Sequence, residues 1–179
     1  AYGMHPDSLK INGCDASTGS LGHGLPIAVG MCLAAKQLKK DFYTYCVLGD
    51  GECDEGSVWE AAKSAAHFKL GNLIAIVDRN GCMIDGPTED VMALEPLDKK
   101  WEAFGFHTQI VDGHDIKALS EAIDVAKIIT DKPSVIIAIT IKGKGVDFME
   151  GITQWHYGSM DSDLAAKAKD SINRGYEIG

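Results

Sequence analysis

The chain has 179 residues, 45% hydrophobic and 24% charged, so it can bury a substantial core as one ordinary globular domain. Its formal net charge of −9 argues against nucleic acid or an anionic membrane as the main partner, because both call for a basic surface. No apolar run approaches the roughly 18 residues of a membrane span, and no signal peptide is visible. The five cysteines match neither a zinc site nor a redox pair, which favours reduced thiols and a cytoplasmic location.

The first half of the chain alternates between helix and strand signals after a glycine-rich, irregular start. Residues 27–39 predict a helix, with Pro26 at a position that helix starts tolerate. Residues 43–48 predict a buried strand. Residues 55–69 predict a helix, because their apolar side chains form one stripe. Gly71 is placed to act as the C′ cap of that helix.

The second half continues the alternation. Strands are expected over residues 73–77, 108–111 and 135–141, and helices over residues 97–104, 116–129 and about the last twenty positions. Residues 143–158 predict a polar loop. The repeated strand–helix–strand order predicts an α/β fold, a mostly parallel sheet with helices on both faces, in a single domain spanning residues 1–179.

Two polar motifs follow consecutive predicted strands. Asp50 stands between two glycines after the first strand, and Asn80 follows the second, 80 − 50 = 30 positions later. Each motif alone is common in tight turns, but a helix separates them, as in a βαβ unit whose parallel strands end at the same edge. A carboxylate, an amide oxygen and the backbone carbonyl of Cys82 would form a hard-oxygen site for a divalent cation that carries phosphates, which suits Mg²⁺.

These motifs resemble the thiamine-diphosphate signature of transketolases, a Gly-Asp-Gly followed about thirty residues later by Asn. The resemblance covers roughly residues 3–160 and is closest to the N-terminal subunit of split transketolases. Further matching motifs are Thr-Gly-Ser-Leu-Gly at 18–22, Glu-Gly at 55–56, Ile-Asp-Gly at 84–86, Lys-Gly-Lys-Gly at 142–145 and Trp-His-Tyr-Gly at 155–158.

The resemblance implies a thiamine-diphosphate-binding fold, with thiamine diphosphate and Mg²⁺ as cofactors and Ca²⁺ or Mn²⁺ as possible substitutes. It implies that the metal ligands are Asp50, Asn80 and the carbonyl of Cys82. The residues it implies for cofactor binding are Gly19, Leu21, Gly49, Asp50, Gly51, Glu55, Asn80 and His156.

Two histidines are implied to act in catalysis. His156 would contact the diphosphate and the region of the reacting carbonyl. His5, in a Gly-x-His-Pro motif, would face the substrate and help with proton transfer or hydroxyl recognition. Histidine suits such work because its pKa lies near neutrality. Glu55 is implied to lie at a subunit interface, near the partner's catalytic carboxylate.

The resemblance implies transfer of a two-carbon ketol group between sugar phosphates, a reaction of carbohydrate metabolism such as the pentose phosphate pathway. A full transketolase has residues before position 1 of this chain and a following pyrimidine-binding domain, whose glutamate starts the chemistry. Neither is found in the chain. We therefore expect the chain to supply half of an active site, with a pyrimidine-binding subunit or domain as partner, in a dimer of heterodimers.

Two alternatives compete with this interpretation. One is another thiamine-diphosphate enzyme, such as deoxyxylulose-phosphate synthase or a component of a 2-oxoacid dehydrogenase. The Ile-Asp-Gly and Lys-Gly-Lys-Gly motifs favour transketolase over both. The other alternative is a non-catalytic fragment that binds the cofactor or regulates a partner.

Overall fold

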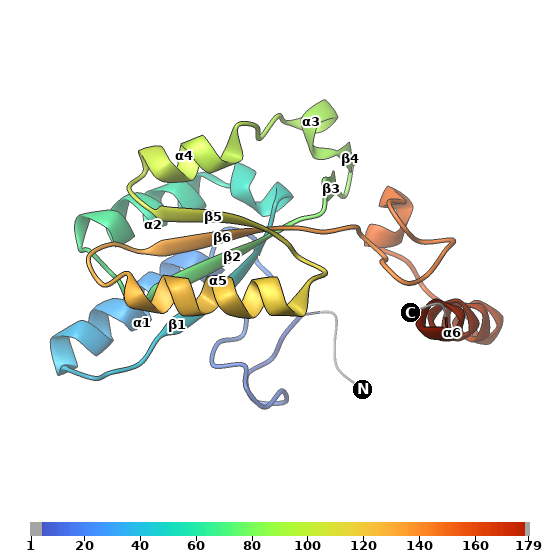
Figure 1. Ribbon diagram of the computed structural model, residues 1–179, viewed down its shortest axis with the longest axis horizontal. Helices are drawn as coiled ribbons and strands as arrows, with labels where there is room; N and C mark the ends of the chain where they lie inside the picture. Colours follow the sequence, from blue (N-terminus) through green and yellow to red (C-terminus); the bar gives the residue numbers. More distant parts are fainter. Residues whose placement is uncertain (1–4, 178–179) are drawn as a thin grey trace.

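The computed structural model describes residues 5–177, and at its centre lies a four-stranded sheet in which all neighbouring strands run parallel (Figure 1). The strand order is β1-β2-β6-β5. The strands are β1 (Thr44–Gly49), β2 (Leu73–Arg79), β5 (His107–Asp112) and β6 (Ser134–Ile139). The central strands β2 and β6 are apolar along most of their length because both of their faces are covered. The predicted parallel α/β sheet is confirmed.

Helices cover both faces of the sheet, three on one side and one on the other (Figure 1). The larger core lies under α1 (Gly24–Leu38), α2 (Gly56–His67) and α4 (Leu97–Ala103). The smaller core lies under α5 (Ile116–Ile128), where Ala122 and Ala126 pack against Ile74 and Ile136 of the central strands. Within the described residues, no helix is long and apolar enough to cross a lipid bilayer.

Several helix ends differ from the sequence prediction, most clearly the start of α1 and the end of α2. Helix α1 begins at Gly24, so Pro26 lies in its first turn, where a missing N–H breaks no helical hydrogen bond. Helix α2 ends at His67, and Lys69 takes the positive φ of +51°. The prediction that Gly71 caps α2 is therefore wrong. Gly71 serves close packing instead, because a Cβ atom there would overlap the backbone carbonyl of Thr130.

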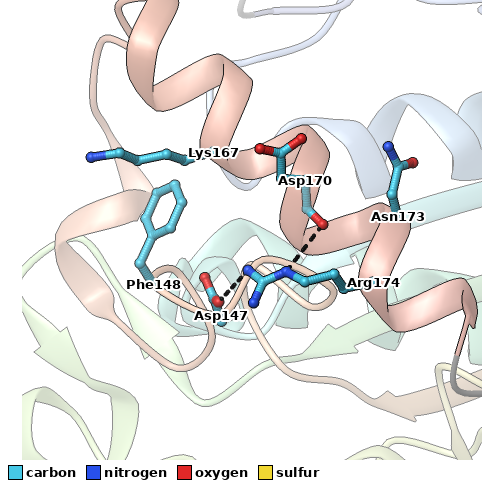
Figure 2. Close-up of a pocket in the computed structure, with 6 residues that line it drawn as sticks. All are labelled: Asp147, Phe148, Lys167, Asp170, Asn173 and Arg174. Atoms are coloured by element: carbon cyan, nitrogen blue, oxygen red, sulfur yellow. Dashed lines mark hydrogen bonds and ion pairs between the residues drawn. The ribbon is translucent and has the colours of Figure 1, made fainter.

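The C-terminal helix α6 (Ser162–Glu177) lies beside the loop that follows β6 rather than on the sheet (Figure 1). Val146 and Met149 of the loop form a small apolar cluster with Ala168 of α6. On the outer side, Arg174 Nη2 lies 3.1 Å from Asp147 Oδ2, which ties the helix to the loop (Figure 2). The loop therefore has its own support, independent of the sheet.

Several short elements near the sheet edge have no counterpart in the sequence prediction. They are too short to show a periodic pattern. They are the 3-10 turn η1 (Gly51–Asp54), the hairpin strands β3 (Cys82–Met83) and β4 (Gly86–Pro87), the helical turn α3 (Thr88–Val91) and the 3-10 turn η2 (Thr153–His156).

Candidate functional site

The carboxyl ends of β1 and β2 lie side by side. Gly49 is in register with Asp78, and the Asp50 N–H donates to the Asp78 carbonyl at 3.1 Å. The loop after β2 folds back onto the loop after β1, because the Gly81 N–H donates to Asp50 Oδ2 at 2.6 Å. The two polar motifs of the sequence therefore meet at one edge of the sheet, where open α/β sheets bind ligands.

The Asp50 carboxylate is buried, with 1% of the residue exposed. Its Oδ1 accepts from the Gly51 N–H at 2.8 Å. Its Oδ2 accepts from Gly81 and from Arg79 Nη1 at 2.9 Å. Because each carboxylate oxygen can accept two bonds, Oδ1 retains one acceptor position. A buried carboxylate oxygen with a free lone pair is suited to a cation.

The side chain of Asn80 is oriented by its neighbours. Its Nδ2 donates to Asp78 Oδ2 at 3.1 Å, and its Oδ1 accepts from the Cys82 N–H at 3.0 Å. The other oxygen of Asp78 accepts from the Thr140 hydroxyl, which anchors Asp78 to the end of β6. This network fixes the amide so that Asn80 Oδ1 also keeps one free lone pair.

Arg79 is a site residue that the sequence reasoning missed. Its Nη1 contacts Asp50 and the Thr88 hydroxyl, at 2.9 and 2.7 Å. Its Nη2 contacts Glu89 and Glu95, at 2.9 and 3.0 Å. With only 11% of its side chain exposed, Arg79 offsets the buried charge of Asp50. The only sequence signal for this role is that a basic residue stands between Asp78 and Asn80 at the end of a strand.

The oxygen atoms at this edge fit a hard divalent cation. Among residues 5–177, no three His, Cys, Asp or Glu side chains gather closely enough to hold a metal. A cation here would therefore depend on one carboxylate and on neutral amide and carbonyl oxygens, a donor set that suits Mg²⁺ or Ca²⁺ and disfavours Zn²⁺.

The glycine loop, residues 18–22, lies beside this edge. His5 is exposed, and its ring packs so closely on Gly19 that an added Cβ would lie 2.6 Å from the ring Cγ. The Glu52 side chain joins the loop to the sheet, because it accepts from the N–H groups of Gly22 and Gly49, at 2.9 and 3.1 Å. The sequence reasoning also missed Glu52. Its position directly after Gly-Asp-Gly carries no local signal for this long-range contact.

His156 lies in η2, which packs on the β3 strand next to the Asp50 loop. Thr153 Oγ1 in the same turn lies 3.7 Å from Cys82 Sγ. Burial and the Lys142 ammonium lower the pKa of His156, while the charge of Asp50 acts in the opposite direction. His156 itself is exposed, and the net effect of these influences favours its neutral form.

Two other residues with expected cofactor roles do not point into this cluster. The Leu21 side chain is 58% exposed. Glu55 is exposed as well, although its Cβ lies against Gly22. His23, which follows the glycine loop, has its Nδ1 3.1 Å from the Leu21 carbonyl. The structure thus gathers Asp50, Asn80, Cys82 and the two flanking glycines. It places the exposed His156 in the adjacent turn η2, and it leaves Leu21 and Glu55 on the surface as well.

A family model described as "Transketolase, thiamine diphosphate binding domain" matches residues 2–177. The chain belongs to this family. Its membership agrees with the arrangement of the Asp50 and Asn80 loops, and it confirms the resemblance drawn from the sequence motifs.

Curated relatives include components of divided transketolases. A subunit of the apulose-4-phosphate transketolase of Phocaeicola vulgatus is 44% identical over 173 residues, which is 97% of this chain and 61% of that protein. The "6-deoxy-6-sulfo-D-fructose transketolase subunit SqwG" of a Clostridium species is 47% identical over 160 residues, covering 89% of this chain and 58% of that protein. The chain thus spans about three fifths of the length of these relatives.

Solved transketolase structures share the fold. The enzyme from Campylobacter jejuni aligns with a TM-score of 0.84 and 34% sequence identity, and the match covers 90% of this chain and 26% of that one. The transketolase-family domain described here therefore corresponds to about a quarter of that longer chain.

Proposed function

We propose that this chain supplies the diphosphate- and metal-binding half of a transketolase-type active site, with thiamine diphosphate and Mg²⁺ as cofactors. The proposal is carried by one observation: two loops from adjacent parallel strands present Asp50 and Asn80 together at the sheet edge. Membership in the transketolase family supports the choice of thiamine diphosphate as the cofactor.

In this proposal the metal is held by Asp50 Oδ1, Asn80 Oδ1 and the carbonyl of Cys82. Gly49 and Gly51 allow the diphosphate to approach the backbone. Gly51 has no room for a side chain, since an added Cβ would lie 2.9 Å from Met83 Cβ. The Asp50–Gly51 turn is thus held against the hairpin, which limits its movement when a charged ligand binds.

When bound, thiamine diphosphate supplies the carbanion chemistry that transfers a ketol group. The chain's own residues hold the diphosphate end and place proton-handling groups beside it. Neutral His156 donates a hydrogen bond to the diphosphate, and His5 faces the sugar. Gly19 and Leu21 line the aminopyrimidine end, and Glu55 faces the partner's active site.

The proposed partner is a pyrimidine-binding subunit or domain, in a dimer of heterodimers. Relatives whose names describe them as transketolase subunits support a divided enzyme. We propose that residues 1–179 form a single diphosphate-binding domain. All five cysteines are free, which supports a reducing compartment such as the cytoplasm.

We propose sugar phosphates as substrates, including those of the pentose phosphate pathway. The relatives' names refer to apulose-4-phosphate and to 6-deoxy-6-sulfo-D-fructose, so related subunits serve sugars with different anionic ends. We therefore propose the reaction, ketol transfer, without naming the donor sugar. Assays with a panel of ketose phosphates would identify the donor.

The decisive experiment is reconstitution with the pyrimidine-binding partner, thiamine diphosphate and Mg²⁺. We expect ketol transfer from a ketose phosphate, and no decarboxylation of pyruvate. Asp50→Asn should abolish Mg²⁺-dependent cofactor binding in calorimetry, whereas Asp124→Asn, on the exposed face of α5, should leave it unchanged. Full cofactor binding by the Asp50 variant would refute the metal site. Cofactor binding without turnover on any sugar would favour a regulatory module.

A further inference from the structure

The side chain of Glu52 joins two distant backbone segments. Its Oε1 accepts from the Gly22 N–H at 2.9 Å, and its Oε2 accepts from the Gly49 N–H at 3.1 Å. Gly22 closes the glycine loop, and Gly49 is the last residue of β1, directly before Asp50. One carboxylate therefore spans the gap between the glycine loop and the diphosphate end of the proposed site.

Gly22 is held on both sides. It is buried, with a φ of +79°, and its carbonyl accepts from Ser57 Oγ at 2.8 Å. A Cβ atom there would lie 2.8 Å from Glu55 Cβ, so a larger residue does not fit. Side chains from η1 and α2 thus satisfy both polar groups of this residue, which leaves the end of the glycine loop little freedom.

The other residues of the glycine loop connect Gly22 to His5. The Thr18 N–H donates to the Pro6 carbonyl at 3.2 Å, and the His5 ring covers Gly19. A groove of about 1020 Å³ runs between this loop and β1, and Glu52 forms part of its wall. Any shift at Gly22 would therefore alter the groove and the placement of His5 together.

The contact depends on the charge and shape of a glutamate. None of the ion pairs formed by residues 5–177 includes Glu52, so its partners are the two backbone N–H groups. Charge-assisted bonds of this kind are about twice as strong as neutral ones. Glutamine has the same size but only one acceptor oxygen, so its amino group would face one of the two N–H donors.

We propose that Glu52 is a positioning residue that fixes the glycine loop relative to Asp50, so that both ends of thiamine diphosphate are gripped at once. This inference rests on the proposed function of the site. It predicts that loss of the contact weakens binding of the whole cofactor and spares binding of the diphosphate moiety alone.

The test compares Glu52→Gln with Glu60→Gln, a matched control on the exposed face of α2. Each variant is reconstituted with Mg²⁺ and the partner subunit, then titrated with thiamine diphosphate and separately with inorganic diphosphate. We expect Glu52→Gln to bind thiamine diphosphate roughly tenfold more weakly, in line with other positioning contacts. Its affinity for inorganic diphosphate should equal that of the Glu60 control.

Two results would overturn the inference: unchanged affinity for thiamine diphosphate, or equal weakening for both ligands. If the unaltered chain bound no thiamine diphosphate, the proposed function would fall instead. Amide hydrogen exchange, measured on the full chain without ligand, then tests the contact of Glu52 with Gly22 and Gly49 directly. Exchange at Gly22 and Gly49 should be faster in Glu52→Gln than in Glu60→Gln, and equal exchange rates would contradict the inference.

Discussion

The Gly81 N–H donates to Asp50 Oδ2 at 2.6 Å, which joins the loops that end β1 and β2. Residues 31 positions apart thereby share one buried carboxylate. The same oxygen accepts from Arg79, so the negative charge is balanced within the protein before any cation arrives. This arrangement holds the Asp50 carboxylate in place, and it makes the stability of the site dependent on Arg79.

Replacing Arg79 by Met should destabilise the chain by about 3–5 kcal/mol, because it leaves the buried Asp50 carboxylate without its ion-pair partner. Mg²⁺ should restore part of this loss, since a bound cation would again offset the carboxylate. Urea unfolding with and without Mg²⁺ measures both effects. The control is Lys99→Met, which removes a largely exposed ion pair with Glu102 and should cost less than about 1 kcal/mol. A small, Mg²⁺-independent loss for Arg79→Met would contradict the prediction.

Gly71→Ala should destabilise the chain by at least about 1–3 kcal/mol, because overpacking against backbone cannot be relieved by a side-chain rotation. The new Cβ would overlap the Thr130 carbonyl group. Gly30→Ala is the matched control, since no atom lies within 4 Å of its added Cβ and Gly30 is inside α1. That change should stabilise by about 0.5–1 kcal/mol. Thermal unfolding of the two variants should therefore shift in opposite directions.

Cys53 should resist alkylation in the folded chain. Burial, together with the charge of Glu52, raises the pKa of its thiol to about 12, so almost no thiolate exists at neutral pH. Cys14 and Cys82 are only half-buried and should be modified first by iodoacetamide. Peptide mapping by mass spectrometry at successive times checks the order. Modification of Cys53 before Cys14 in native protein would show that the η1 segment opens readily.

The pKa of His156 gives the chain a pH dependence with a defined sign. Burial and Lys142 hold this pKa below the ordinary value of 6.5, so the unfolded chain takes up the proton at a higher pH than the folded one. The contribution of His156 to stability is therefore complete above pH 6.5 and is lost as the pH falls through the folded pKa. His156→Gln should lose less stability than the unaltered chain between about pH 7 and pH 5, as measured by urea unfolding. His67→Gln, on the exposed surface of α2, serves as the control, and equal pH dependence in all three proteins would count against the assignment.

Much of the fold follows from patterns that lie within a few residues of one another. The stripe of α2, the apolar runs of β2 and β6, and the polar residues at two strand ends are all local features. The meeting of Asp50 with the Asn80 loop also follows from them, because a crossover helix between parallel strands brings their ends to one edge. The short hairpin after Asn80 escaped prediction because two-residue strands show no period.

The sequence by itself determined the order of elements, the family and the two motifs at the sheet edge, since these depend on local periodicity and on fixed spacings. Only the tertiary structure decided that Arg79 turns back to Asp50, that Glu52 clamps Gly22, and that Gly71 packs on Thr130 instead of capping α2. Each of these contacts joins segments 29 or more positions apart or depends on how loops pack, so no local pattern encodes it. These contacts form only when the helices are packed on the sheet.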